Sequence, residues 1–431
     1  TVTALNANGG TLLDAAGNSL ATFTANPSGT LVIDTTAPTV SSVVATGTGI
    51  TSGSGTLKAG AVVTLTVNTS ENVTVNTTGG TPTLSLSSGG TATYSSGSGT
   101  SALVFTYTVG ATDNTADLTV TALNANGGTL LDAAGNSLAT FTNNPSGTLV
   151  IDTAAPTVSS VVASGTGISS GSGTLKAGAV VTLTVNTSEA VTVAGGTPTL
   201  SLNSGGTATY SSGSGTTALV FTYTVGATDN AADLTVTALN ANGATLTDAV
   251  GNSLATFTNN PSGTLVIDTT APTASSVVAT GTGITSGSGT LKAGAVVTLT
   301  VNTSEGVTVA GGTPTLSLSS GGTATYDAAS STSTALKFTY TVAAGENTAD
   351  LTVTALNKNG ATLTDAAGNS LATFTANPSG TLVIDTTAPT IAIASSKSAL
   401  KAGETATITF TLSESSTDFT VGDGAGTGGS T

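Results

Sequence analysis

The sequence predicts an all-β chain made of tandem two-sheet antiparallel sandwich units in an extended array. Three observations lead to this fold class. A long segment repeats along the 431 residues, short stretches alternate apolar and polar residues, and nothing shows a convincing helical period. Alternation at a period of two is typical of half-buried strands, and several short strands separated by turn residues are typical of a two-sheet sandwich.

The repeat is clearest in residues 147–158, Gly-Thr-Leu-Val-Ile-Asp-Thr-Ala-Ala-Pro-Thr-Val, which recur nearly unchanged about every 117 residues. The central Asp-Thr and the Pro predict a stiff hinge between two strands, because proline has no backbone donor and fixes its own φ. We place the unit boundaries at these hinges. The predicted units are 1–35 (the C-terminal part of a repeat), 36–153, 154–269 and 270–386 (whole repeats), and 387–431 (the N-terminal part of a divergent repeat).

Within the first whole unit, the clearest strand signal is the run 102–109, in which Leu103, Phe105, Tyr107 and Val109 alternate with smaller or polar residues. These four side chains are expected to face the core, with Tyr94 and Phe141 as further filling. Seven strands follow from the same pattern: 40–45, 61–70, 83–87, 91–95, 102–109, 117–123 and 148–151.

Composition and charge exclude several classes of function. The chain has 22 acids against 7 basic residues, with a formal charge of −15, so binding to nucleic-acid phosphates is not expected. Cysteine is absent, which excludes disulfides and thiolate metal sites. No apolar run approaches membrane-spanning length, so direct membrane insertion by this segment is not expected either.

The few carboxylates of each unit are expected to gather at one pole. If successive strands reverse direction, the second strand brings Glu71 to the lower pole, the sixth brings Asp132 there, and the preceding hinge delivers Asp34. By the same parity, Asp113 and Lys58 lie at the opposite pole.

Three neighbouring carboxylates without a basic partner have two physical outcomes, raised pKa values or a bound hard cation. Ca²⁺ accepts six to eight oxygen ligands in flexible geometry, and we favour it as the bound cation. A plainer interpretation is that each aspartate only caps a turn. The predicted calcium ligands form three sets and a partial fourth: Asp34, Glu71, Asp132; Asp152, Glu189, Asp248; Asp268, Glu305, Asp365; and Asp385, Glu414.

Four segments together resemble bacterial Ig-like repeats of large secreted surface adhesins, the biofilm-associated and type I-secreted kind. They are the hinge 151–156, the segment 187–193, the strand 218–225 and the turn 248–252, Asp-Ala-Val-Gly-Asn. Residues 395–414 are similar to a second repeat type of the same adhesins. The resemblance implies Ig-like domains, a location on the bacterial cell surface, and calcium at the domain junctions that stiffens an extended arm.

The function expected from these features is a non-enzymatic extender of a cell-surface adhesin, in which each unit adds about 40 Å. The alternative is a structural subunit of an extracellular filament, sheath or S-layer. A sugar- or ice-binding module fits less well because the strands are short, and an enzyme least of all, because His, Cys and Arg are absent. Beyond calcium, neighbouring copies of the chain and other cell-surface material are the candidate partners.

Overall fold

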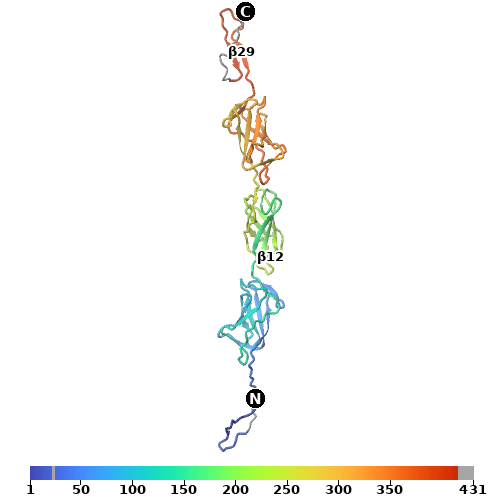
Figure 1. Ribbon diagram of the computed structural model, residues 1–431, viewed down its shortest axis with the longest axis vertical. Coiled ribbons are helices and arrows are strands. Elements are labelled where there is room, and N and C mark those ends of the chain that lie inside the picture. Colours follow the sequence, from blue (N-terminus) through green and yellow to red (C-terminus); the bar gives the residue numbers. More distant parts are fainter. Residues whose placement is uncertain (22–24, 416–431) are drawn as a thin grey trace.

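The structure, a computed structural model, describes residues 1–21 and 25–415, and within these ranges every regular element is a strand. Three compact bodies follow one another in a single row, and the terminal segments lie at opposite ends of that row (Figure 1). We refer to the bodies as the first, second and third sandwich. In the part of the chain described, no helix is long and apolar enough to cross a membrane.

The first sandwich contains one long curled antiparallel sheet of order β1-β3-β6-β5-β4-β7, with β8 added to the far end of β3. A separate two-stranded parallel sheet joins β2 to β9. Its strands are β1 (Val40–Thr46), β2 (Gly55–Leu57), β3 (Val62–Asn76), β4 (Thr83–Leu86), β5 (Thr91–Ser96), β6 (Thr100–Thr108), β7 (Val120–Asn124), β8 (Thr129–Leu131) and β9 (Leu149–Ile151).

The second sandwich repeats this topology strand for strand. Its strands are β10 (Val158–Ser164), β11 (Gly173–Leu175), β12 (Val180–Ala194), β13 (Thr199–Leu202), β14 (Thr207–Ser212), β15 (Thr216–Thr224), β16 (Val236–Asn240), β17 (Thr245–Thr247) and β18 (Leu265–Ile267).

In the third sandwich, the long strand that corresponds to β3 and β12 is split in two. Its strands are β19 (Ala274–Thr280), β20 (Gly289–Leu291), β21 (Val296–Thr303), β22 (Thr308–Ala310), β23 (Thr315–Leu318), β24 (Thr323–Tyr326), β25 (Ala335–Thr341), β26 (Val353–Asn357), β27 (Thr362–Thr364) and β28 (Leu382–Ile384). Beyond it, β29 (Ile391–Ser395) and β30 (Ile408–Leu412) form a two-stranded antiparallel sheet.

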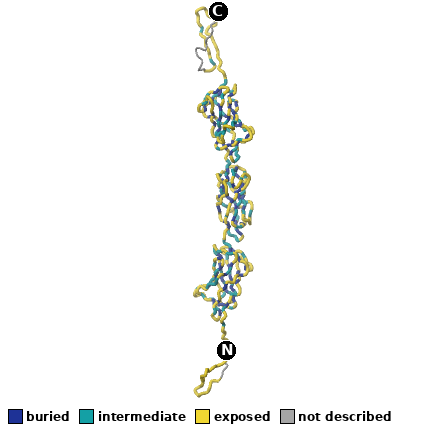
Figure 2. Tube along the Cα trace, in the orientation of Figure 1, coloured by how far each residue is buried: buried dark blue, intermediate teal, exposed yellow. Residues whose placement is uncertain are grey.

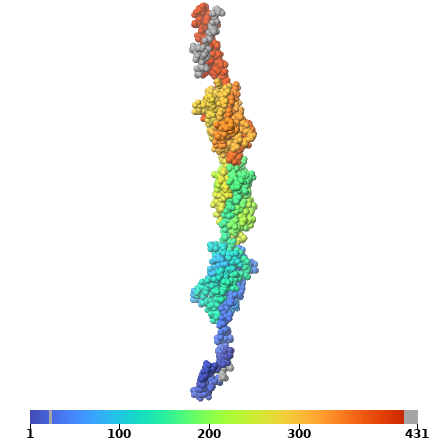
Figure 3. Space-filling view, in the orientation of Figure 1, coloured from blue at the N-terminus to red at the C-terminus, as the bar shows by residue number. Residues whose placement is uncertain are grey.

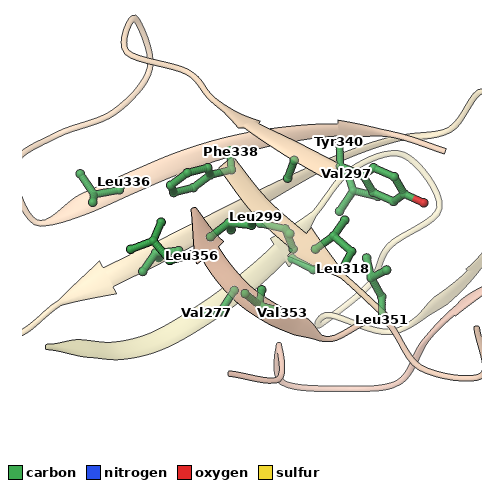
Figure 4. Close-up of a cluster of buried hydrophobic side chains, with 14 of the residues drawn as sticks. Val277, Val297, Leu299, Leu318, Leu336, Phe338, Tyr340, Leu351, Val353 and Leu356 are labelled. Atoms are coloured by element: carbon green, nitrogen blue, oxygen red, sulfur yellow. The ribbon is translucent and has the colours of Figure 1, made fainter. Parts of the chain in front are cut away.

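Each sandwich encloses its own hydrophobic core, and buried residues are concentrated inside the three bodies (Figure 2). In the first sandwich, Phe105 and Tyr107 are almost completely buried, and the ring of Tyr94 packs edge-on against Phe105 with centroids 5.6 Å apart. The third sandwich places Phe338 and Tyr340 in the same way among leucines and valines (Figure 4). The predicted core face of the strongest strand is therefore confirmed.

The fold of tandem all-β sandwiches predicted from the alternation is confirmed, but the strand count and the purely antiparallel pairing were wrong. The first sandwich has nine strands rather than seven, because β2 and β8 were missed. Both span three residues, which is too short to establish a period of two. In addition, β2 pairs in parallel with β9, so each sandwich contains one parallel pair.

Candidate metal centres at the junctions

Each sandwich carries three carboxylates at the pole where the chain enters it. One oxygen from each of the three residues lies within 4.8 Å of the others, in all three sandwiches. The bodies are joined at these poles by narrower connections (Figure 3). The three groups are the ones expected from the sequence: Asp34, Glu71, Asp132; Asp152, Glu189, Asp248; and Asp268, Glu305, Asp365.

The convergence has a different cause from the strand parity that predicted it. Glu71 lies inside the long strand β3, between Asn68 and Val73, where the pairing with β6 changes register. Beyond that irregularity, β3 pairs with β8, and Thr74 lies opposite Leu131. Asp132 directly follows β8, so this short strand brings it close to Glu71. The missed strand β8 is thus what positions the third acid.

The Asp-x-x-Gly-Asn turn holds its aspartate firmly. In the second sandwich, Oδ1 of Asp248 accepts hydrogen bonds from the backbone amides of Val250 and Asn252, each at 2.8 Å. Oδ2 accepts one from the side-chain amide of Asn252 at 2.7 Å. The plainer interpretation, that this aspartate caps its own turn, is therefore correct. It is compatible with metal binding, because a carboxylate offers about four acceptor positions and Oδ2 keeps one free.

The same asparagine connects the turn to the hinge. Nδ2 of Asn252 also donates to the backbone carbonyl of Asp152, at 3.1 Å. The hinge aspartate forms a local turn of its own, since its Oδ1 accepts the amide of Ala154 at 3.0 Å. Two of the three acids in each group are thereby positioned by hydrogen bonds that do not require an ion.

The glutamate is the carboxylate without such support. Among the residues that the structure describes, no hydrogen-bond donor reaches the carboxylates of Glu71, Glu189 or Glu305. Partial burial raises the pKa of Glu189, and the negative charges of Asp152 and Asp248 raise it further. The pKa values of Glu71 and Glu305 are raised for the same reasons.

The aspartate of the turn shifts in the opposite direction. Burial alone would raise the pKa of Asp248, but the hydrogen bonds from Asn252 and from the turn amides outweigh burial and lower it. The pKa of Asp132 is lowered by the equivalent contacts. In the first and second sandwiches, the acidic pole therefore combines an aspartate that is held in its charged form with a glutamate whose charge is opposed by burial and by its neighbours.

The grouping of these oxygens is compatible with a shared cation, because two ligands of one ion lie at most twice the metal–oxygen distance apart. The three oxygens of each group are within 4.8 Å of one another. Ca²⁺–oxygen distances of about 2.3–2.6 Å allow ligand separations of up to about 4.6–5.2 Å. The three carboxylates would supply part of the coordination shell, with carbonyls and waters completing it.

The partial fourth set, Asp385 and Glu414, can be compared with the first group by its position relative to the strands. The backbone amide of Ser413 donates to the carbonyl of Thr390 at 2.8 Å, as that of Ser70 does to Thr39. Glu414 therefore occupies the position that corresponds to Glu71, although it is exposed. Within 1–21 and 25–415, neither Asp385 nor Glu414 belongs to a group of three acids.

At the opposite pole, Asp113 has a role within its own sandwich. It accepts hydrogen bonds from the hydroxyl of Tyr107 at 2.7 Å and from the amide of Gly110 at 2.9 Å. The neighbouring Asn114 accepts the amide of Thr153 in the outgoing hinge. The predicted location of Asp113 at this pole is consistent with these contacts, and its donors are all internal.

Sequence reasoning placed Lys58 away from its own acids but missed what it contacts. Its Nζ donates to the carbonyl of Gly251 at 3.2 Å, in the acid-bearing turn of the following sandwich. Lys176 makes the equivalent contact with Gly368 at 3.0 Å. The assumption that no basic residue reaches the acidic pole was therefore wrong. The signal that could have found these lysines is their position in the turn before the long strand, at the pole that meets the next unit.

Comparison with protein families gives a match for the last part of the chain. Residues 385–431 match the family described as "Bacterial Ig-like domain". Comparison with curated proteins gives no match.

Three of the similar solved structures are an I-band fragment of titin, I67–I69, the dimeric latent PorU from Porphyromonas gingivalis, and a putative membrane anchored protein from Corynebacterium diphtheriae. Sequence identities are 10%, 10% and 11%, and TM-scores are 0.29, 0.17 and 0.17. The matches cover 82%, 86% and 76% of this chain, and 100%, 36% and 90% of the other chains. These scores are too low to support any functional inference.

Proposed function

We propose that this chain is a non-enzymatic extender region of a bacterial cell-surface adhesin, whose junctions are stiffened by calcium. The proposed repeats are 36–153, 154–269 and 270–386, each meeting its predecessor at one acidic pole. The proposed location is the bacterial cell surface, outside the cell. There the chain would hold a binding region away from the surface that carries it.

One observation carries the proposal: at three successive poles, a glutamate whose carboxylate receives no hydrogen-bond donor in the described chain lies against two aspartates. Leaving three negative charges together is unfavourable. The pKa of each glutamate is raised first by partial burial and then by the charges of its two aspartate neighbours. A divalent cation removes the repulsion. Because one aspartate comes from the hinge and the other two acids from the following sandwich, the same ion would fix the angle between the hinge and that sandwich.

The experiment is small-angle X-ray scattering of the whole chain, in calcium and in chelator. We expect a longer maximum dimension and a narrower distance distribution with calcium, because bound ions restrain the hinges. A variant in which Glu71, Glu189 and Glu305 are all replaced by glutamine should scatter in calcium as the parent does in chelator. The matched control is Glu346→Gln, which removes one charge elsewhere.

Identical scattering curves with and without calcium would contradict the stiffening. Ordered polymers of the purified chain, seen by electron microscopy, would instead support a structural subunit of a filament, sheath or S-layer.

A further inference from the structure

A second kind of contact crosses the junctions and involves no metal. Lys58 lies in the turn between β2 and β3, and Lys176 lies in the same turn of the second sandwich. Each lysine reaches past its own sandwich and donates from Nζ to a backbone carbonyl of the next one: Gly251 at 3.2 Å and Gly368 at 3.0 Å. Both acceptors belong to the Asp-x-x-Gly-Asn turn that also presents an acid to the junction.

Glycine at these positions fits the contact. Gly251 has a φ of +94° and Gly368 of +88°, a left-handed conformation that other residues rarely adopt. A Cβ built on Gly251 would lie 3.1 Å from the lysine Nζ, and one on Gly368 would lie 3.4 Å from it. The lysine ammonium group therefore packs against the side of the turn where any residue other than glycine would carry a Cβ.

The first junction provides an internal contrast. Gly135 has the same φ of +94°, but a Cβ built on it would meet nothing within 4 Å. Gly135 is exposed, whereas Gly251 and Gly368 are half-buried. The turn therefore adopts its conformation without the lysine, and the lysine covers it from outside. Because the turn does not need the lysine in order to fold, the contact between lysine and turn can serve to hold neighbouring sandwiches together.

The lysine does not act as an ion-pair partner of the acids. In the part of the chain that the structure describes, the one ion pair within 4.0 Å joins Lys397 to Glu404. The carbonyl of Gly251 is instead the acceptor for Lys58. The lysine thus leaves the carboxylates free for a cation while it holds the backbone of the same turn.

We propose that the lysine of each Leu-Lys-Ala-Gly turn is a docking residue, which seats the Asp-x-x-Gly-Asn turn of the following Ig-like unit and restrains the junction without any metal. We call the surface around each of these lysines the seat. In the first and second sandwiches it is occupied by the Asp-x-x-Gly-Asn turn of the next sandwich, whose Gly251 or Gly368 carbonyl accepts the lysine's hydrogen bond. The third sandwich carries the same seat around Lys292, where a hollow of about 670 Å³ is lined in part by Gly294 and Asp385.

The experiment measures motion across the junction between the second and third sandwiches. The chain has no cysteine, so spin labels can be attached uniquely to cysteines introduced by Ala227→Cys and Ser333→Cys, both at exposed positions. The test variant is Lys176→Met, which keeps the unbranched stem and removes the donor. Its matched control is Lys337→Met, which changes a lysine within β25 of the third sandwich.

In chelator, we expect Lys176→Met to broaden the label-to-label distance distribution about twofold, and Lys337→Met to leave it unchanged. An unchanged distribution for Lys176→Met in chelator, with circular dichroism showing a folded chain, would overturn the proposal. The result is independent of calcium binding. If calcium alters no variant while Lys176→Met still broadens the distribution, the docking lysine stands and the calcium-stiffened junction fails.

Discussion

Two carboxylates at opposite poles of the first sandwich differ in what surrounds them. Asp113 receives the hydroxyl of Tyr107 and the amide of Gly110, so its charge is satisfied within the sandwich. The carboxylate of Glu71 has two aspartates beside it and, among the described residues, no hydrogen-bond donor. The difference teaches that the charge of Asp113 is stabilised within its own sandwich, whereas the carboxylate of Glu71 lies against two further negative charges.

The third sandwich supports this division. There the tyrosine hydroxyl donates to Glu346 instead of an aspartate, at 2.6 Å, while Ser320 stays beside it. A longer acid can therefore take over the folding role. At the other pole, the acids keep the same identities in all three groups.

The largest expected effect is that of calcium itself. At a free concentration 100 times its dissociation constant, an ion that binds only the folded state adds about 2.7 kcal/mol of stability. We expect the free energy of unfolding of each sandwich to rise by about that amount, seen by calorimetry as a higher melting temperature in calcium than in chelator. Magnesium at equal concentration is the control and should give a smaller rise. Equal melting temperatures in calcium and in chelator would contradict the view that the acidic pole binds an ion while the Asp113 pole does not.

The second effect concerns the folding acid. Asp229→Ala should destabilise the second sandwich by about 2 kcal/mol, because a hydrogen bond from Tyr223 to a charged acceptor is lost. The loss should be the same with and without calcium, as followed by urea unfolding. Asp229→Glu should restore most of the stability, since Glu346 serves at the corresponding place. A calcium-dependent loss would show that this pole also binds the ion.

The third effect compares two glutamates of the same sandwich. Glu305→Gln should weaken calcium binding at one site at least tenfold, about 1.4 kcal/mol, because a charged ligand is lost. Glu346→Gln removes the same charge but should leave calcium affinity unchanged. Both are measured by isothermal titration calorimetry. Equal affinities for the two variants would mean that the acidic pole is not the binding site.

The smallest effect is the pH dependence of the metal-free chain. The pKa of Glu189 in the folded state is raised above its ordinary value of 4.5, so the folded state binds the proton more tightly than the unfolded state. Stability should therefore rise as pH falls from neutral toward about 4.5 in chelator. Asp248 has the opposite effect, because its pKa in the folded state is lowered and the unfolded state therefore binds the proton more tightly. The free energy of unfolding should fall as pH drops below the ordinary aspartate value of 3.8.

Calcium should reverse the first part of this profile, because protons compete with the ion for Glu189. Melting curves at several pH values, with and without calcium, test both signs. A profile in chelator that falls steadily from neutral pH would contradict the repulsion inferred at the acidic pole.

The sequence predicted those parts of the fold in which a pattern is long enough to read. The alternation from Leu103 to Val109 identified β6 and its buried face. Three-residue strands such as β8 carry no such pattern, and their existence depends on pairing with distant residues. The grouping of the acids was predicted correctly from a strand count that was wrong, because β8 and the irregularity near Glu71 together return the chain to the same pole.

The lysine contact could not be derived from one unit. Lys58 and Gly251 are 193 residues apart in the chain, and whether they meet depends on the orientation of two neighbouring sandwiches. Residue patterns within a repeat do not specify that orientation. The role of Asp113 was missed for a related reason: it depends on the direction of the Tyr107 hydroxyl, which alternation alone does not determine.

The most direct test of the cation-bound junction is a calcium titration of the whole chain with the number of sites as the result. We expect three comparable sites, one for each complete group of acids, and two when Glu189 alone is replaced by glutamine. Absence of saturable binding, or three sites that persist when Glu71, Glu189 and Glu305 are all replaced, would contradict the account.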